Sequence, residues 1–126
     1  MLSRLLRALF GRRPPSLSSG NETALLNYSL ELAQEWGDQW LKPIQDRLRK
    51  SYPSLSQSEL DRLNSEAQAA MNDGHQLVYS MVEKNGRDIS ESSWRETYLA
   101  SHPWVDEKNL RHLFSTGQYY AWKDFG

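Results

Sequence analysis

Three histidines, at positions 75, 102 and 112, are the side chains best suited to metal binding or proton transfer. No two of them stand four residues apart, and none follows a glutamate in a Glu-x-x-His pair. These are the spacings by which one helix presents ligands to zinc or to a di-iron centre. The chain has no Cys, which excludes disulfides, thiolate zinc ligands and cysteine nucleophiles. We therefore expect neither a metal nor a cofactor.

Carboxylates and serines supply the other candidates for catalysis. Glu66 and Asp73 are the acids most suited to a position near the core, while Glu31 and Glu35 lie one turn apart on a polar helix face. No Gly-x-Ser-x-Gly elbow, Ser-x-x-Lys box or Gly-rich phosphate loop occurs. We predict a protein that is not an enzyme, with an enzyme or metal protein built from scattered residues as an alternative.

Aromatic residues crowd the C-terminal end of the chain. In a helix over residues 107–124, His112, Tyr119 and Trp122 fall away from the apolar face that Leu110 and Phe114 define. Tyrosine and tryptophan are favoured at the energetic centres of protein interfaces. We interpret this second stripe as a partner-binding surface, with packing beneath a neighbouring helix as the alternative.

The N-terminus is basic and amphipathic, with leucines on one helical face and arginines opposite. Such a segment suits reversible contact with an anionic membrane or with a partner protein; docking on the body, disorder and organelle targeting are alternatives. Its apolar stretches are too short for a secretory signal or a bilayer span. The candidate contact residues are Leu2, Arg4, Leu5, Leu6, Arg7, Leu9, Phe10, Arg12 and Arg13.

Charge is distributed unevenly along the 126 residues. Residues 1–13 carry +4 without an acid, whereas the remaining residues carry 11 basic and 16 acidic groups, a net −5. An acidic body disfavours binding to phosphate backbones, so we expect no nucleic-acid partner. We expect a cytoplasmic protein, with peripheral attachment to a membrane as the alternative.

The elements that must position these residues are all predicted to be helices. Residues typical of strands are scarce, whereas apolar residues recur at helical spacing in nearly every segment. We predict an all-α fold, a small bundle of four to five helices with a separate short N-terminal amphipathic helix. The predicted helices cover residues 2–10, 22–41, a short stretch between Pro43 and Pro53, 57–85, 91–101 and 107–124.

Breakers and caps set the predicted boundaries. Gly11, Pro14 and Pro15, followed by a Ser-rich stretch, divide the chain into a basic segment with its linker, residues 1–20, and a single helical domain, residues 21–126. Helix starts are predicted at Asn21, at the capping box from Ser56 to Glu59, at Ser90 and at Asp106. Small residues along helix 57–85, namely Ala67, Ala70 and Gly74, predict that another helix crosses it closely.

Taken together, these patterns favour a noncatalytic protein–protein interaction module, such as a helical adaptor, inhibitor or immunity-type protein. Its expected partner is another protein. The alternative is a peripheral membrane protein that residues 1–13 anchor reversibly to an anionic surface.

Overall fold

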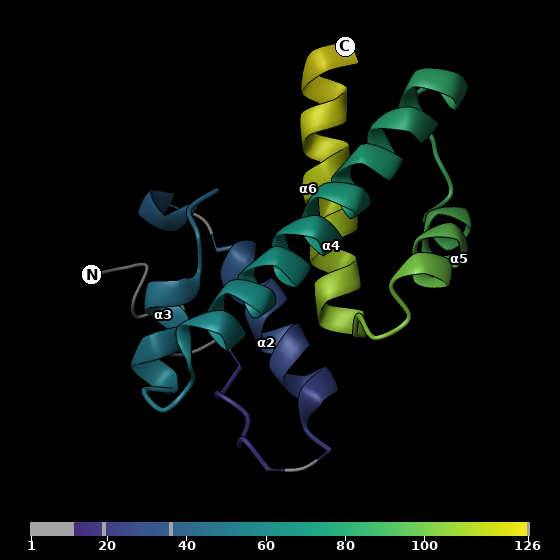
Figure 1. Ribbon diagram of the computed structural model, residues 1–126. Coiled ribbons are helices and arrows are strands. Elements are labelled where there is room, and N and C mark those ends of the chain that lie inside the picture. Colours follow the sequence, from purple (N-terminus) through teal and green to yellow (C-terminus); the bar gives the residue numbers. More distant parts are fainter. Residues whose placement is uncertain (1–11, 19, 36, 126) are drawn as a thin grey trace.

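The computed structural model describes residues 12–18, 20–35 and 37–125. Within these residues the chain forms five α-helices and one short 3-10 helix, without a strand, which confirms the all-α prediction (Figure 1). The predicted helix over residues 2–10 lies outside the described residues. The elements are α2 (Glu22–Ala33), η1 (Gly37–Gln39), α3 (Gln45–Ser51), α4 (Gln57–Asn85), α5 (Glu91–Ser101) and α6 (Glu107–Phe125).

Helix α4 is the central element, and the other helices pack along it (Figure 1). Helices α2 and α3 lie against its N-terminal half, while α5 and α6 approach its C-terminal half. Its 29 residues run unbroken through Asn72, Asp73 and Gly74. No described helix combines the length and apolar character needed to cross a bilayer.

The buried face of α4 differs from the predicted stripe at its C-terminal end. The apolar spacing predicts Leu77 and Met81 as inward-facing, but both are half-buried, and Val78 and Val82 are buried instead. The buried row shifts to the valines because α6 approaches α4 from the side of Val78, where Gly117 of α6 has no side chain. The direction of the neighbouring helix therefore decided which of two adjacent apolar rows became core.

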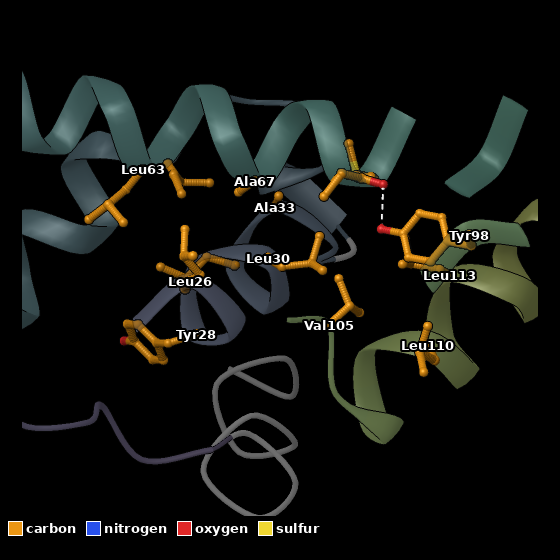
Figure 2. Packing of buried hydrophobic residues seen from close by; sticks show 14 of the residues in the cluster. Leu26, Tyr28, Leu30, Ala33, Leu63, Ala67, Tyr98, Val105, Leu110 and Leu113 are labelled. Atoms are coloured by element: carbon orange, nitrogen blue, oxygen red, sulfur yellow. Dashed lines mark hydrogen bonds between the residues drawn. The ribbon is translucent and has the colours of Figure 1, made fainter. Parts of the chain in front are cut away.

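The small residues of α4 are approached closely by long side chains from α5 and α6, while a close crossing of a whole helix at these residues stays a prediction. A Cβ atom on Gly74 would lie 3.3 Å from the ring of Tyr98 and 3.4 Å from the side chain of Leu113. The Tyr98 hydroxyl donates to the backbone carbonyl of Ala70 at 2.8 Å, so α5 reaches the α4 backbone where side chains are small (Figure 2).

The prediction for the first body helix is wrong in length. Helix α2 ends at Ala33, and Gly37 adopts a φ of 89°, a left-handed conformation that interrupts helices and suits glycine. Trp40, which was predicted to lie on this helix, instead follows η1 and packs beside the core from a loop.

Three of the four predicted N-caps are confirmed. Ser56, Ser90 and Asp106 each accept a hydrogen bond from the backbone N–H three residues further on. Asn21 does not cap α2 with its side chain: its amide donates to the Ser16 carbonyl at 2.9 Å. The preceding chain folds back against Asn21 and supplies an acceptor that a local pattern does not show.

Candidate functional site

Helix α6 presents one face to the core and the opposite face to solvent. As predicted, its inward residues are buried: Leu110, Leu113, Phe114, Gly117 and Ala121. Tyr119 lies on the outward side, where 56% of the residue is exposed, and Phe125 is 48% exposed at the end of the helix. Both values are high for large apolar rings, so this end of the helix is a candidate contact surface.

Trp122, the second predicted contact residue, is half-buried and packs against the core. Its indole N–H donates to the backbone carbonyl of Arg87 at 3.2 Å, and the Arg87 guanidinium carbon lies 4.7 Å from the ring centroid. Trp122 therefore ties α6 to the loop between α4 and α5 and still offers part of its ring at the surface.

Two further aromatic residues, which the sequence stripe did not include, complete this end of α6. Tyr120 stacks on Trp40 with ring centroids 6.3 Å apart, and Phe125 meets Tyr79 edge to face at 5.3 Å. The many aromatic residues near the C-terminus could have indicated their involvement. The helical spacing, however, placed Tyr120 and Phe125 outside the predicted stripe of His112, Tyr119 and Trp122. We call the aromatic residues distributed around this end of the helix, namely Tyr119, Tyr120, Trp122 and Phe125, the α6 aromatic surface.

His112 lies on the same helix two turns before Tyr119, nearer the N-terminal end of α6. It lines an open groove of about 590 Å³, together with Glu31, Lys108, Arg111 and Ser115 among others. Burial lowers the pKa of His112, and Lys108 adds to this effect, while Glu31 partly opposes it. All three residues of the predicted stripe lie on α6, with His112 at the groove and Tyr119 and Trp122 nearer the C-terminal end, and their joint role in binding stays a prediction.

The remaining histidines occupy separate surroundings. His102 directly follows the last residue of α5. Its Nε2 atom lies 2.9 Å from the carboxylate of Asp73 on α4, and its ring stacks on Tyr98. His75 is half-buried beside Trp40, and its Nε2 atom has no hydrogen-bond partner. In the part of the chain that the structure describes, no three His, Asp or Glu side chains converge in a way that suits a metal ion.

The burial of His75 predicts sensitivity to acid. Burial, with a smaller contribution from nearby His112, lowers the pKa of His75 to about 4 from an ordinary 6.5. The unfolded chain therefore binds the proton more readily, and stability that is complete above pH 6.5 is lost as the pH falls toward 4. We expect a loss of up to roughly 2 kcal/mol between pH 7 and pH 5.

The measurement is urea unfolding at both pH values for the wild type and for His75→Phe. The phenylalanine ring preserves the contact with Trp40 but does not titrate. Because the pKa of His112 is also lowered, the variant should keep a smaller part of the acid sensitivity. Equal acid sensitivity in the two proteins would contradict the assignment to His75.

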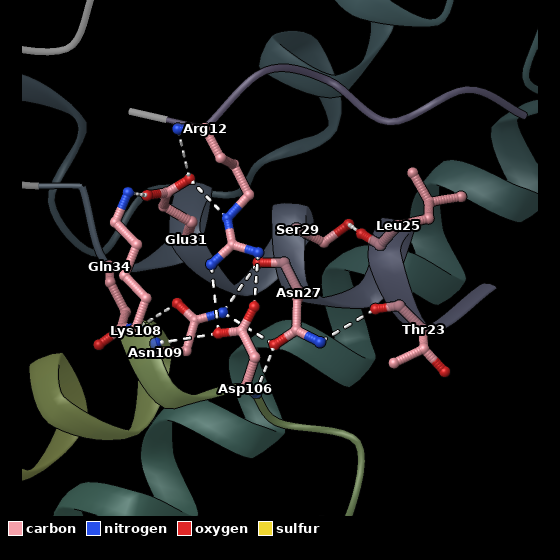
Figure 3. A network of polar contacts seen from close by, with 10 residues as sticks. All are labelled: Arg12, Thr23, Leu25, Asn27, Ser29, Glu31, Gln34, Asp106, Lys108 and Asn109. Atoms are coloured by element: carbon pink, nitrogen blue, oxygen red, sulfur yellow. Dashed lines mark hydrogen bonds and ion pairs between the residues drawn. The ribbon is translucent and has the colours of Figure 1, made fainter. Parts of the chain in front are cut away.

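Beside the N-terminus of α6, Arg12 forms a clamp between distant segments (Figure 3). Its guanidinium binds both oxygens of Asp106, at 2.6 and 3.2 Å, and its Nε donates to Glu31 at 3.0 Å. Burial alone would raise the pKa of Asp106, but hydrogen bonds from Arg12 and from the Asn109 backbone outweigh it and hold that pKa below its usual range. The Asp106 carboxylate therefore carries charge at neutral pH.

Buried amides support the clamp from behind. Asn27 accepts from the Asp106 backbone N–H at 2.9 Å, and the Asn109 side chain donates to Asn27. Gln34 donates in turn to Asn109 at 2.9 Å. These contacts join α2 to the N-terminus of α6 and satisfy most of the polar atoms that the junction buries.

The structure places only two of the nine predicted N-terminal contact residues, because the other seven lie outside the described residues. Arg12 is held in the clamp, whereas the adjacent Arg13 is exposed. The Tyr52 hydroxyl donates to the carbonyl of Pro15. Arg12 and Pro15 thus contact the helical body, although the sequence placed both in the segment of residues 1–20. The boundary near residue 21 stays a prediction.

Comparison with known proteins gives no match for this chain: neither a protein-family model, nor a curated protein, nor a solved structure resembles it significantly.

Proposed function

We propose that this protein is a noncatalytic interaction module that binds a partner protein through the α6 aromatic surface. The observation that carries the proposal is the exposure of Tyr119 and Phe125, at 56% and 48%, on one end of a helix whose other face is fully packed. Exposed aromatic rings on a rigid support are typical of the residues that dominate binding energy in protein interfaces.

Contacts with neighbouring segments hold the residues of the α6 aromatic surface in place. Tyr120 stacks on Trp40, and the Tyr79 hydroxyl donates to the Tyr120 carbonyl at 3.3 Å. Trp122 is fixed by Arg87. A partner would therefore meet rings that are already positioned, which reduces the conformational entropy lost on binding.

Photo-crosslinking tests this proposal. With p-benzoylphenylalanine in place of Tyr119, irradiation of cells that naturally make the protein should yield a discrete adduct with one other protein. The same label in place of Ser65, an exposed residue on α4, should yield no such adduct. Phe125→Asp should reduce the adduct formed from position 119, because it places a charge within the contact surface.

Thermal unfolding of Phe125→Asp checks that this variant still folds, which we expect because about half of the residue is exposed at the end of the helix. Absence of an adduct from position 119 would contradict the proposal. So would an identical set of adducts from position 65, since that result would show only nonspecific collisions.

The charge distribution favours a second candidate function, peripheral attachment to a membrane through residues 1–13. These residues carry +4 against −5 in the rest of the chain, and Arg13 is exposed where the described chain begins. Attraction of a basic segment to anionic lipid falls with ionic strength. This function therefore requires salt-sensitive sedimentation of the full chain with vesicles that contain phosphatidylserine, and none with phosphatidylcholine alone.

A further inference from the structure

Arg12 and Arg13 are neighbours in the sequence but differ in their availability. Arg13 is exposed, whereas the Arg12 side chain is 22% exposed and its guanidinium binds two carboxylates. Of the two arginines that the structure describes in residues 1–13, Arg12 is therefore neutralised by the protein itself. This contact affects any surface that the basic segment would bind by its charge.

The two carboxylates form a site that is organised independently of Arg12. We call Glu31 and Asp106 the notch. Asp106 is fixed because it caps α6, accepting from the Asn109 backbone N–H at 3.1 Å, and because its own N–H donates to Asn27. Glu31 is held from its other side by Lys108, at 2.6 Å. These contacts hold both carboxylates of the notch in position to bind a guanidinium.

We propose that the notch competes with an anionic membrane surface for Arg12, and so weakens the binding of residues 1–13 to that surface. This inference rests on the membrane attachment proposed above. A guanidinium held between the two carboxylates has its positive charge compensated and is mostly buried, so it adds little attraction to a lipid phosphate. The paired, charge-assisted hydrogen bonds to Asp106 and the bond to Glu31 exceed what one headgroup contact offers, so Arg12 stays with the body.

The size of the effect follows from the number of cations available. Each cation near an anionic bilayer contributes about 1 kcal/mol, which corresponds to about fivefold in affinity. Release of Arg12 from the notch should therefore strengthen vesicle binding about fivefold.

The experiment measures sedimentation of full-length protein with vesicles that contain phosphatidylserine. In the notch variant, Glu31→Gln is combined with Asp106→Asn, which removes both charges; asparagine preserves the cap of α6 because it is an equally good N-cap residue. We expect this variant to bind about fivefold more tightly than the wild type. Adding Arg12→Gln to the notch variant should abolish that gain.

A matched control removes two charges elsewhere. Glu66→Gln combined with Glu83→Gln changes the net charge equally on the exposed face of α4, and should strengthen binding far less. In the wild-type background, Arg13→Gln should weaken binding about fivefold, and Arg12→Gln should weaken it less. Circular dichroism confirms that each variant folds.

Two results would overturn the inference, and they are distinguishable. If the notch variant binds no more tightly than the wild type, while Arg12→Gln and Arg13→Gln weaken binding equally, then Arg12 is already available to lipid and the notch does not compete. If neither the wild type nor the notch variant sediments with these vesicles, membrane attachment itself is wrong, and the competition proposed here falls with it.

Discussion

Replacement of Trp94 by alanine is expected to lower the free energy of unfolding by about 3–5 kcal/mol. Trp94 is completely buried in α5, where its ring stacks on Tyr98 at 4.9 Å and lies 5.4 Å from Phe114. Its indole N–H donates to the Gly74 carbonyl at 3.1 Å. The substitution removes the largest fully buried side chain and leaves a cavity where α4, α5 and α6 meet.

Urea unfolding followed by circular dichroism measures this effect without depending on tryptophan fluorescence. Trp94→Phe separates the two contributions, because it keeps an aromatic ring but loses the hydrogen bond and part of the volume. This milder variant should remain folded even if the alanine variant does not, since small domains are stabilised by only about 5–15 kcal/mol. A loss below about 1 kcal/mol for Trp94→Ala would show that α5 contributes little to the core.

The second large effect is expected at the crossing of α4 and α6. Gly117→Leu should destabilise the protein by about 3 kcal/mol, the upper end of the usual penalty for overpacking a core. A Cβ atom at position 117 would already lie 2.8 Å from Cγ2 and 3.0 Å from Cβ of Val78. Because the valine Cβ is fixed to the α4 backbone, the two helices would have to move apart.

Ser115→Leu is the matched control, since it adds a comparable side chain to the exposed face of the same helix and should change stability little. A further test uses Gly117→Ala, whose penalty should shrink when Val78→Ala is added, because the closest colliding atom, Cγ2 of Val78, is then absent and only the contact with Cβ remains. If Gly117→Leu and Ser115→Leu have equal effects on urea unfolding, the close approach at Gly117 is wrong.

Local interactions explain which features could be predicted. The caps at Ser56, Ser90 and Asp106 join residues three positions apart, so their partners are visible in the sequence. Where a partner lay outside the usual capping spacing, prediction failed: Asn21 uses its side chain on Ser16. The helix expected to reach residue 41 ends at Ala33, and this prediction failed for another reason: it gave apolar periodicity more weight than Gly37, a nearby residue that interrupts the helix.

The candidate surfaces also divide into features that local spacing predicts and contacts that it does not predict. Helical phase correctly placed Tyr119 away from the buried face of α6, because that phase depends only on spacing. It could not show that Trp122 meets Arg87 across a loop, or that Tyr120 stacks on Trp40. These contacts depend on where separate helices and loops end in space.

By itself, the sequence determined that the chain is helical, where most of the described helices begin, and which face of α6 is apolar, since periodicity and capping act over a few residues. The tertiary structure alone decided which apolar row of α4 meets α6, and that Arg12 joins Glu31 and Asp106. The physical reason is distance along the chain. Arg12 meets Glu31 and Asp106 only when α2 packs against α6, and no pattern within a short stretch of sequence can predict this contact.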